Sequence, residues 1–335
     1  MAETENKKRI EYLDFLKVIG LIGIMIAHVD SPKWALMARA FDVPLMVLIA
    51  SMLGRKSYEK RVACGEKASS YLVSRVLRLA VPTWIFLVFF FLVYAVFSRS
   101  FFEPIYYVKS FLFSLYGISY VWVILIYIYS AVCMPLFHKV GTGKIVCVAL
   151  IWIYALYEML WYLEFLTDNK VFVNTFYYII PYGALSFIGF CYPAMKEKTK
   201  KTVAIVFATI FFAFIMIVKA ITGEFDTVGI ATFPPRLYYL SYGIFVSFVL
   251  FLVFERFDLK IYKSKPVAFV SKNSLWIYLW HIFCLEVYNR TPLFNFWYVE
   301  LVAVFVTSAL ITFVQVKLVE AVRRKRDFRF LKYLA

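Results

Sequence analysis

The stretch DFLKVIGLIGIMIAHVDSPKW, residues 14–34, decides the fold class and raises the first functional question. Its apolar run approaches the roughly 20 residues that are needed to cross the hydrocarbon core of a bilayer. Lys17 lies in the first turns of this run and His28 lies near its end. Ionisable side chains inside a membrane span are costly and rare, and they mark functional sites by default. The stretch therefore predicts a transmembrane helix with two polar groups that need an explanation.

Apolar runs of similar length recur along the whole chain. The 335 residues are 63% hydrophobic, with a mean hydropathy of +0.76, whereas soluble domains are nearer half apolar. We therefore predict an all-α polytopic membrane protein, with residues 1–335 forming a single membrane domain and no appended soluble domain. The ten predicted transmembrane helices cover residues 10–29, 35–53, 79–97, 119–137, 145–162, 176–193, 202–221, 238–254, 269–287 and 299–318.

The basic residues indicate how the chain is oriented. The net charge of +16 could suggest a nucleic-acid partner, but its distribution argues otherwise. Lys and Arg together number 7 in residues 54–78 and 7 from residue 317 onward, whereas alternate loops hold only one or two. The positive-inside rule then places both termini in the cytoplasm. The charge mostly reflects topology, with a secondary role in contacting membrane lipid or an anionic cytosolic substrate.

A cleaved signal peptide is the competing interpretation of residues 1–40. The sequence KKR resembles the basic start of such a peptide, and ARA resembles a cleavage site. We favour an uncleaved span, because the apolar run is too long and His28, Asp30 and Pro32 separate it from ARA. The five cysteines show no CxxC spacing, so neither disulfides nor a metal site is expected.

Lys17 and His28 have a spacing that fits one face of a helix. Eleven positions at 100° per residue come to within about 20° of whole turns, with a rise of roughly 16 Å. Asp14 precedes Lys17 by three residues and is placed to pair with it. The alternative is that Lys17 snorkels to the inner surface and that His28 only caps the outer end. The occurrence of both residues on one face favours function.

Asp42 lies near the outer end of the second predicted span, at a depth similar to that of His28. A carboxylate beside an imidazole can orient the ring and stabilise its cation. The alternative is that Asp42 lies in the membrane interface beside Arg39.

Arg75 and Arg78 lie just before the third predicted span, at positions i and i+3 of one helix face. Two guanidinium groups at the entry to the membrane suit a ligand that carries phosphates. Topological anchoring and contact with lipid headgroups is the alternative explanation.

The ninth predicted span contains VSKNSLWIYLWHIF, residues 270–283. Ser274, Tyr278 and His281 occur there at i, i+4 and i+7, so they share one helix face. His281 is expected in the outer half of the membrane, near the depth of His28. Alone it would be interpreted as a structural histidine, but two of the three histidines of the chain in one leaflet indicate a site.

Taken together, these patterns resemble the acyltransferase-3 family of integral membrane O-acyltransferases. Two departures from the family pattern are a lysine in place of the commoner arginine at position 17 and MVLIAS where the second span has FFxxSG. Four motifs in chain order carry the resemblance: LDFLK for LDxLR, Lys17 to His28 for (R/K)-x10-H, Arg75 and Arg78 for R-x-x-R, and SLWIYLWH, from Ser274 to His281, for SLxIYLxH.

The resemblance implies transfer of an acyl group, typically acetyl, from cytosolic acyl-CoA to a hydroxyl of a cell-surface or lipid-linked glycan at the cell membrane. Arg75 and Arg78 would then hold the phosphates of the donor, and Lys17 would guide the thioester arm or balance charge along it. His28 is then the general base, or forms a transient acyl-histidine, and no metal is involved.

Asp42 or His281 would orient that base, and Ser274 and Tyr278 would contact the substrate. If the reaction needs an SGNH-type or glycan-synthesis partner, a separate chain must supply it. The competing functions are a transporter, flippase or exporter of glycans or lipid-linked sugars, or a structural partner in glycan synthesis. A transporter does not need a histidine at a fixed distance from a basic residue.

Overall fold

The computed structural model describes residues 2–98, 101–223, 225, 232–290, 295–325 and 329–334. This described part is mainly helical and contains no strand, which confirms the all-α prediction. The ten spans and their orientation stay predictions. Seven helical segments of the described chain are long and apolar enough to cross a membrane: Lys33–Ala63, Ala68–Ser98, Ser119–Val140, Lys144–Tyr162, Glu197–Thr222, Leu237–Phe254 and Trp297–Lys325.

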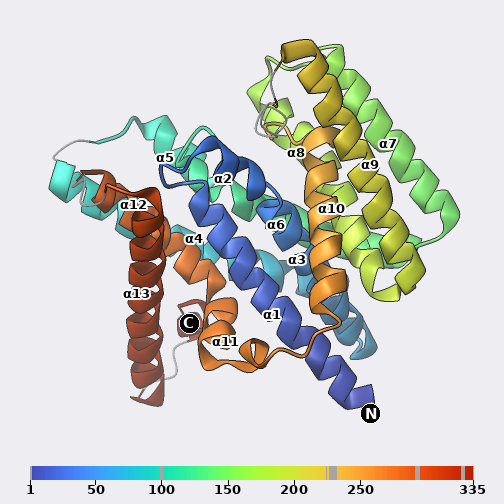
Figure 1. Ribbon diagram of the computed structural model, residues 1–335. Helices are drawn as coiled ribbons and strands as arrows, with labels where there is room; N and C mark the ends of the chain where they lie inside the picture. Colours follow the sequence, from blue (N-terminus) through green and yellow to red (C-terminus); the bar gives the residue numbers. More distant parts are fainter. Residues whose placement is uncertain are drawn as a thin grey trace. The chain divides into compact units, whose positions relative to one another are not determined.

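The backbone divides into two compact units, whose helices are labelled in Figure 1. Unit 1 comprises Met1–Pro32, Arg75–Leu125 and Leu259–Ala335. Unit 2 comprises Lys33–Ser74 and Ile126–Asp258. Each unit is therefore built from segments that are distant in the sequence.

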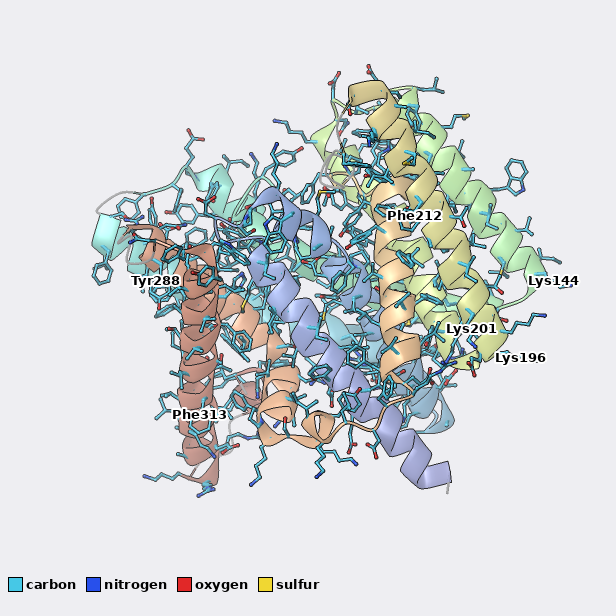
Figure 2. All side chains as sticks on the ribbon, in the orientation of Figure 1. Lys144, Lys196, Lys201, Phe212, Tyr288 and Phe313 are labelled. Carbon is cyan, nitrogen blue, oxygen red and sulfur yellow. The ribbon has the colours of Figure 1, made fainter. Side chains whose placement is uncertain are left out.

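Unit 1 is organised around α1 (Ala2–Ile26). In this unit α1 lies against α11 (Lys265–Lys272), as Figure 1 shows, and also contacts α12 (Ser274–Arg290) and α13 (Trp297–Lys325). Figure 2 labels Tyr288, which belongs to α12, and Phe313, which belongs to α13, at different heights in unit 1. The rest of the unit includes most of α4 (Ala68–Ser98) and α5 (Pro104–Phe111), and one of its cores is formed by Val29, Cys284, Leu285 and Val304.

The first predicted span ends earlier than expected. Helix α1 stops at Ile26, and His28 lies in the turn that follows. The His28 N–H donates to the Met25 carbonyl at 3.0 Å, an i→i−3 bond that is tighter than those of an α-helix. The Ser31 hydroxyl then donates to the Ile26 carbonyl at 2.8 Å and satisfies one of the last helical carbonyls. The prediction of one helix over residues 10–29 is therefore wrong for residues 27–29, which include His28.

The ninth predicted span, residues 269–287, is not one helix. It breaks at Asn273 into α11 and α12. The backbone N–H and the side-chain amide of Asn273 both donate to the Phe269 carbonyl, at 3.0 and 2.9 Å. Asparagine competes for backbone groups in this way and favours helix ends. The second predicted span is likewise divided, into α2 (Lys33–Ala38) and α3 (Asp42–Ala63).

Unit 2 is organised around α3, which contacts α8 (Lys170–Cys191) and α10 (Leu237–Phe254). Glycines allow both contacts to be close. A Cβ at Gly189 would lie 2.7 Å from the backbone oxygen of Leu48, and a Cβ at Gly243 would lie 2.4 Å from Cγ of Pro44. Small residues permit such approach between membrane helices. Unit 2 also contains most of α6 (Trp122–Val140), α7 (Lys144–Tyr162) and α9 (Glu197–Thr222).

Basic residues lie close to one another at the N-terminal ends of α7 and α9. Figure 2 shows Lys144, Lys196 and Lys201 at the same end of unit 2. These residues belong to two of the segments that the charge distribution assigns to one side of the membrane. The arrangement within the unit agrees with that assignment, whereas the identity of the side stays a prediction.

Candidate active site

The turn after α1 and the middle of α12 bring two histidines into contact within unit 1. Nδ1 of His28 lies 3.0 Å from Nε2 of His281. The rings are nearly parallel, with centroids 5.2 Å apart and planes at 20°. His281 is fully buried and His28 is half-buried. The sequence predicted only a similar depth for the two residues, and the structure places them in hydrogen-bonding contact.

The hydrogen bonds of this pair determine which nitrogen carries each proton. Nδ1 of His281 contacts the Tyr278 carbonyl, which only accepts, so this nitrogen carries a hydrogen. A neutral imidazole has one N–H, so Nε2 of His281 is the acceptor in the contact with His28. The His28 Nδ1–H is then the donor. With both rings neutral, Nε2 of His28 carries the lone pair that a general base uses.

Aromatic residues hold this pair from the side. The Tyr120 ring meets His28 edge-on, with centroids 4.6 Å apart and planes at 81°. The Tyr278 hydroxyl donates to the Tyr120 carbonyl, and Tyr278 lies 4.7 Å from the His281 ring between centroids. Tyr278 therefore contacts both Tyr120 and His281, and its contact with substrate stays a prediction. Ser274, predicted on the same face, begins α12 about 10 Å along the helix from His281.

A second polar cluster surrounds Lys17, which lies nearer the N-terminus of α1. The Lys17 ammonium donates to Asp14 at 3.0 Å and to the Ser271 hydroxyl at 3.2 Å. The Ser271 hydroxyl donates in turn to the same Asp14 oxygen at 2.7 Å. The side chain of Lys17 is 20% exposed, so the group is only partly shielded from its surroundings. The predicted pairing of Asp14 with Lys17 is confirmed, and Ser271 on α11 completes the cluster.

Arg75 and Arg78 both lie in α4, one turn apart, where unit 1 resumes along the chain. Arg75 is half-buried and Arg78 is exposed. The predicted one-face arrangement on a single helix is therefore observed. A role in binding phosphate stays a prediction.

Asp42 belongs to unit 2 and is fully buried at the start of α3. Its Oδ2 pairs with the Arg39 guanidinium at 2.7 Å, and its Oδ1 accepts from the Val43 N–H at 2.6 Å. This is the local arrangement that the sequence offered as the alternative to a catalytic role. The expectation that Asp42 orients the imidazole is untested, whereas His281 has the contact that such a role requires.

Two members of these clusters were missed by the sequence analysis. Ser271 is an ordinary serine by its sequence, and its role depends on the break at Asn273 that positions α11 beside α1. Tyr120 is one of 25 tyrosines, and nothing in its immediate neighbours distinguishes it. No local pattern indicates either contact, because each joins segments far apart in the chain. Among the described residues, no three His, Cys, Asp or Glu side chains gather as metal ligands would.

Comparison with known families accounts for these motifs together. The family model described as an acyltransferase domain, acyltransferase-3, matches residues 10–316, nearly the whole chain. The chain belongs to the acyltransferase-3 family. The matched range contains every residue of the histidine pair, the Lys17 cluster and the arginine pair.

Membership of the acyltransferase-3 family makes the chain a multi-pass membrane acyltransferase. A comparison with curated proteins finds no match, and a comparison with solved structures finds none either. The donor, the acceptor and the roles of single residues in this acyltransferase-3 protein must therefore be argued from its own side chains.

Proposed function

We propose that this acyltransferase moves an acetyl group from cytosolic acetyl-CoA to a sugar hydroxyl of a cell-surface or lipid-linked glycan at the plasma membrane. The contact between His28 and His281 is the observation that carries the proposal. It gives a half-buried imidazole a defined orientation and a basic Nε2, which is what a general base for a hydroxyl needs.

In the proposed reaction, Nε2 of His28 accepts the proton of the acceptor hydroxyl as the oxygen attacks the thioester carbon. The carbon–sulfur bond of the thioester breaks and an ester carbon–oxygen bond forms. The proton then passes to the sulfur, and CoA leaves as the thiol. His281 keeps the His28 Nδ1–H engaged throughout, which holds the ring in one orientation. An acyl-histidine intermediate is the alternative use of the same nitrogen.

We assign the donor to the basic side of unit 1. Arg75 and Arg78 would bind the nucleotide phosphates, because guanidinium groups pair with phosphate oxygens in a bidentate way. Lys17 would guide the thioester arm. Its ammonium has three N–H donors, and Asp14 and Ser271 accept from two directions, which holds it in place. Lys17 lies nine positions before the end of α1 at Ile26, a rise of roughly 14 Å, and His28 lies in the turn just beyond; this separation suits an extended arm.

The test compares single-residue variants in native membranes. His28→Ala is expected to lower acetyl transfer from isotopically labelled acetyl-CoA to cell-envelope glycan by about 10²–10⁴-fold, the usual contribution of a general base. His138→Ala is the matched control, because His138 lies in the last turn of α6, in unit 2, and packs on Tyr58. Mass spectrometry of the glycan measures the product.

A wild-type rate of transfer in His28→Ala would show that the catalytic assignment is wrong. An absence of labelled ester with the unaltered protein, combined with loss of glycan export when the protein is deleted, would favour the transporter function instead. Equal losses in His28→Ala and His138→Ala would point to general damage and would contradict a specific role for His28.

A further inference from the structure

A group of aromatic side chains lies where the end of α4 meets α5, in unit 1. We call Tyr94, Phe102, Tyr106 and Tyr107 the α5 aromatic cluster. The Phe102 ring lies 4.5 Å from Tyr94 and 4.5 Å from Tyr106 between centroids, and it stacks on Tyr106 at 19°. Tyr106 and Tyr107 are both half-buried. The cluster therefore presents flat apolar surface with phenolic hydroxyls at its edge.

Helix α12 brings a charged pair to this cluster. The Arg290 guanidinium pairs with Glu286 at 2.7 Å and lies over the Tyr94 ring, 4.9 Å from its centroid. Glu286 and Arg290 are 39% and 46% exposed, so a ligand can reach them. Burial, with the nearby Glu286 carboxylate, raises the pKa of Tyr106, so its hydroxyl stays protonated at neutral pH and can donate a hydrogen bond.

Tyr120 connects this surface to the histidine pair. Its ring meets His28 edge-on at 4.6 Å. Helix α12 makes a second connection, because Glu286 follows His281 by five positions, a rise of about 7.5 Å. The Tyr278 hydroxyl holds the Tyr120 backbone in place. A ligand that contacts Glu286 would thus lie about one and a half turns of α12 from His281, the partner of His28.

The charges of this surface indicate a neutral ligand. Glu286 and Arg290 neutralise each other, so the pair offers hydrogen bonds of both kinds without a net charge. A phosphate would be repelled by Glu286, and an amine by Arg290. Aromatic rings beside a few polar groups bind ligands that have both apolar and polar faces, and a sugar ring is such a ligand.

We infer that Tyr106, Tyr120 and Glu286 form an acceptor subsite that binds a neutral sugar ring next to His28. The inference rests on the proposed function and deepens it, because it names the side chains that would recognise the acceptor. The rings supply contact with the C–H face of the sugar, Glu286 accepts from its hydroxyls, and Tyr106 donates to them.

The opposite face of α5 indicates where the sugar comes from. Ile105, Val108 and the C-cap residue Leu112 occur on one helix face and are 51%, 52% and 67% exposed. Exposed apolar side chains on one face are typical of a helix that lies in the membrane interface. The subsite is then at the level of lipid headgroups, and a sugar anchored in the membrane is the acceptor that this position favours.

The experiment measures acceptor and donor binding separately with the full-length protein in lipid nanodiscs. The probes are a polyprenyl-linked disaccharide and the soluble methyl glycoside of the same disaccharide. Glu286→Gln and Tyr106→Leu are each expected to raise KM for the lipid-linked probe at least tenfold, while KM for acetyl-CoA changes less than twofold. Glu103→Gln is the matched control, because Glu103 is an exposed carboxylate at the N-cap of α5, the helix that carries Tyr106.

Each outcome supports or overturns a separate part of the inference. An unchanged KM for the disaccharide in Glu286→Gln, or an equal rise in Glu103→Gln, would overturn the subsite. An equal KM for the lipid-linked and soluble probes would overturn the anchored source of the sugar. Acetylation of neither probe by the unaltered protein, while it still hydrolyses acetyl-CoA, would count against the proposed glycan acceptor itself, and this result does not depend on any variant.

Discussion

His281 is fully buried within α12, and burial of a polar ring is costly unless its nitrogens are hydrogen-bonded. Both of its nitrogens have partners, the Tyr278 carbonyl and the His28 ring. These contacts give His281 a role that differs from that of His28. We propose that His281 fixes the tautomer and orientation of its neighbour and does not itself exchange a proton in the reaction.

At this residue scale we predict that the side chain at 281 matters as a hydrogen-bond acceptor. His281→Gln retains an amide oxygen that can accept from the His28 Nδ1–H, whereas His281→Leu has similar bulk and no acceptor. His281→Leu is expected to lower kcat for acetyl transfer by about 10–10²-fold, which corresponds to the roughly 1–3 kcal/mol of a lost buried hydrogen bond. His281→Gln is expected to raise the activation free energy by less than half as much as His281→Leu does. Steady-state kinetics in nanodiscs measure both variants.

KM for acetyl-CoA is expected to stay constant in both variants, because the contact lies away from the proposed donor side. Indistinguishable kcat values for the Gln and Leu variants would contradict the positioning role and would make His281 a packing residue. A thermal melt of each variant separates loss of fold from loss of orientation.

At the scale of elements, α8 packs closely on α3 in unit 2. Gly189 permits it, because a Cβ there would lie 2.7 Å from the Leu48 oxygen and 2.9 Å from Cβ of Ser51. The Ser51 hydroxyl on the same helix contacts Ser130 of α6 at 2.9 Å. Three helices thus meet around Ser51, a residue that the sequence analysis placed in the second span.

We predict that Gly189→Ala destabilises the protein by about 1–3 kcal/mol, the usual cost of overpacking, because backbone atoms of α3 cannot yield as a side chain can. Gly183→Ala is the matched control on the same helix, since its added Cβ would meet only Sγ of Cys133, at 4.0 Å. Alanine favours a helix over glycine by about 0.5–1 kcal/mol, so the control should be unchanged or slightly more stable. The free energy of unfolding in mixed micelles measures both, and equal stability of the two variants would contradict the close approach.

At the scale of the whole molecule, the exposed surface of the helices is apolar. Only 6% of the most apolar window of α7 and 11% of that of α9 is buried, against 56% for the segment Lys33–Ala63. Such helices are stable only where lipid covers them, because their backbone groups are satisfied internally and their side chains suit hydrocarbon. Unit 2, which contains both of these helices, therefore requires the bilayer as its solvent.

The orientation of the molecule can be tested with cysteine labelling. Cys64 is free and exposed in the basic segment 54–78, for which we predict a cytoplasmic location. In a variant that keeps only this cysteine, a membrane-impermeant maleimide is expected to react at least tenfold faster after the cells are permeabilised. Asp168 lies between the predicted spans 145–162 and 176–193, in a loop that this orientation places outside the cell. Asp168→Cys, in the same background without Cys64, is therefore the control and should react equally in intact and permeabilised cells. Labelling of Cys64 in intact cells would overturn the orientation and, with it, the proposed donor side.

Local chemistry explains which predictions about the elements succeed. Each expected apolar run lies within or overlaps a helix, because hydropathy and helical hydrogen bonding are properties of consecutive residues. The ends of the helices were harder to predict. The tight turn at His28 and the break at Asn273 depend on single side-chain and backbone hydrogen bonds that compete with the helix.

The sequence by itself determined the all-α membrane class, the family motifs and the pairs that are close along the chain. Asp14 pairs with Lys17, and Asp42 pairs with Arg39, because three residues make one helical turn. Only the tertiary structure decided that His28 meets His281, 253 positions away, and that Ser271 joins the Lys17 cluster, 254 positions away. The physical reason is that a local pattern specifies which face of a helix is polar, whereas the partner of that face depends on how helices distant in the chain pack together.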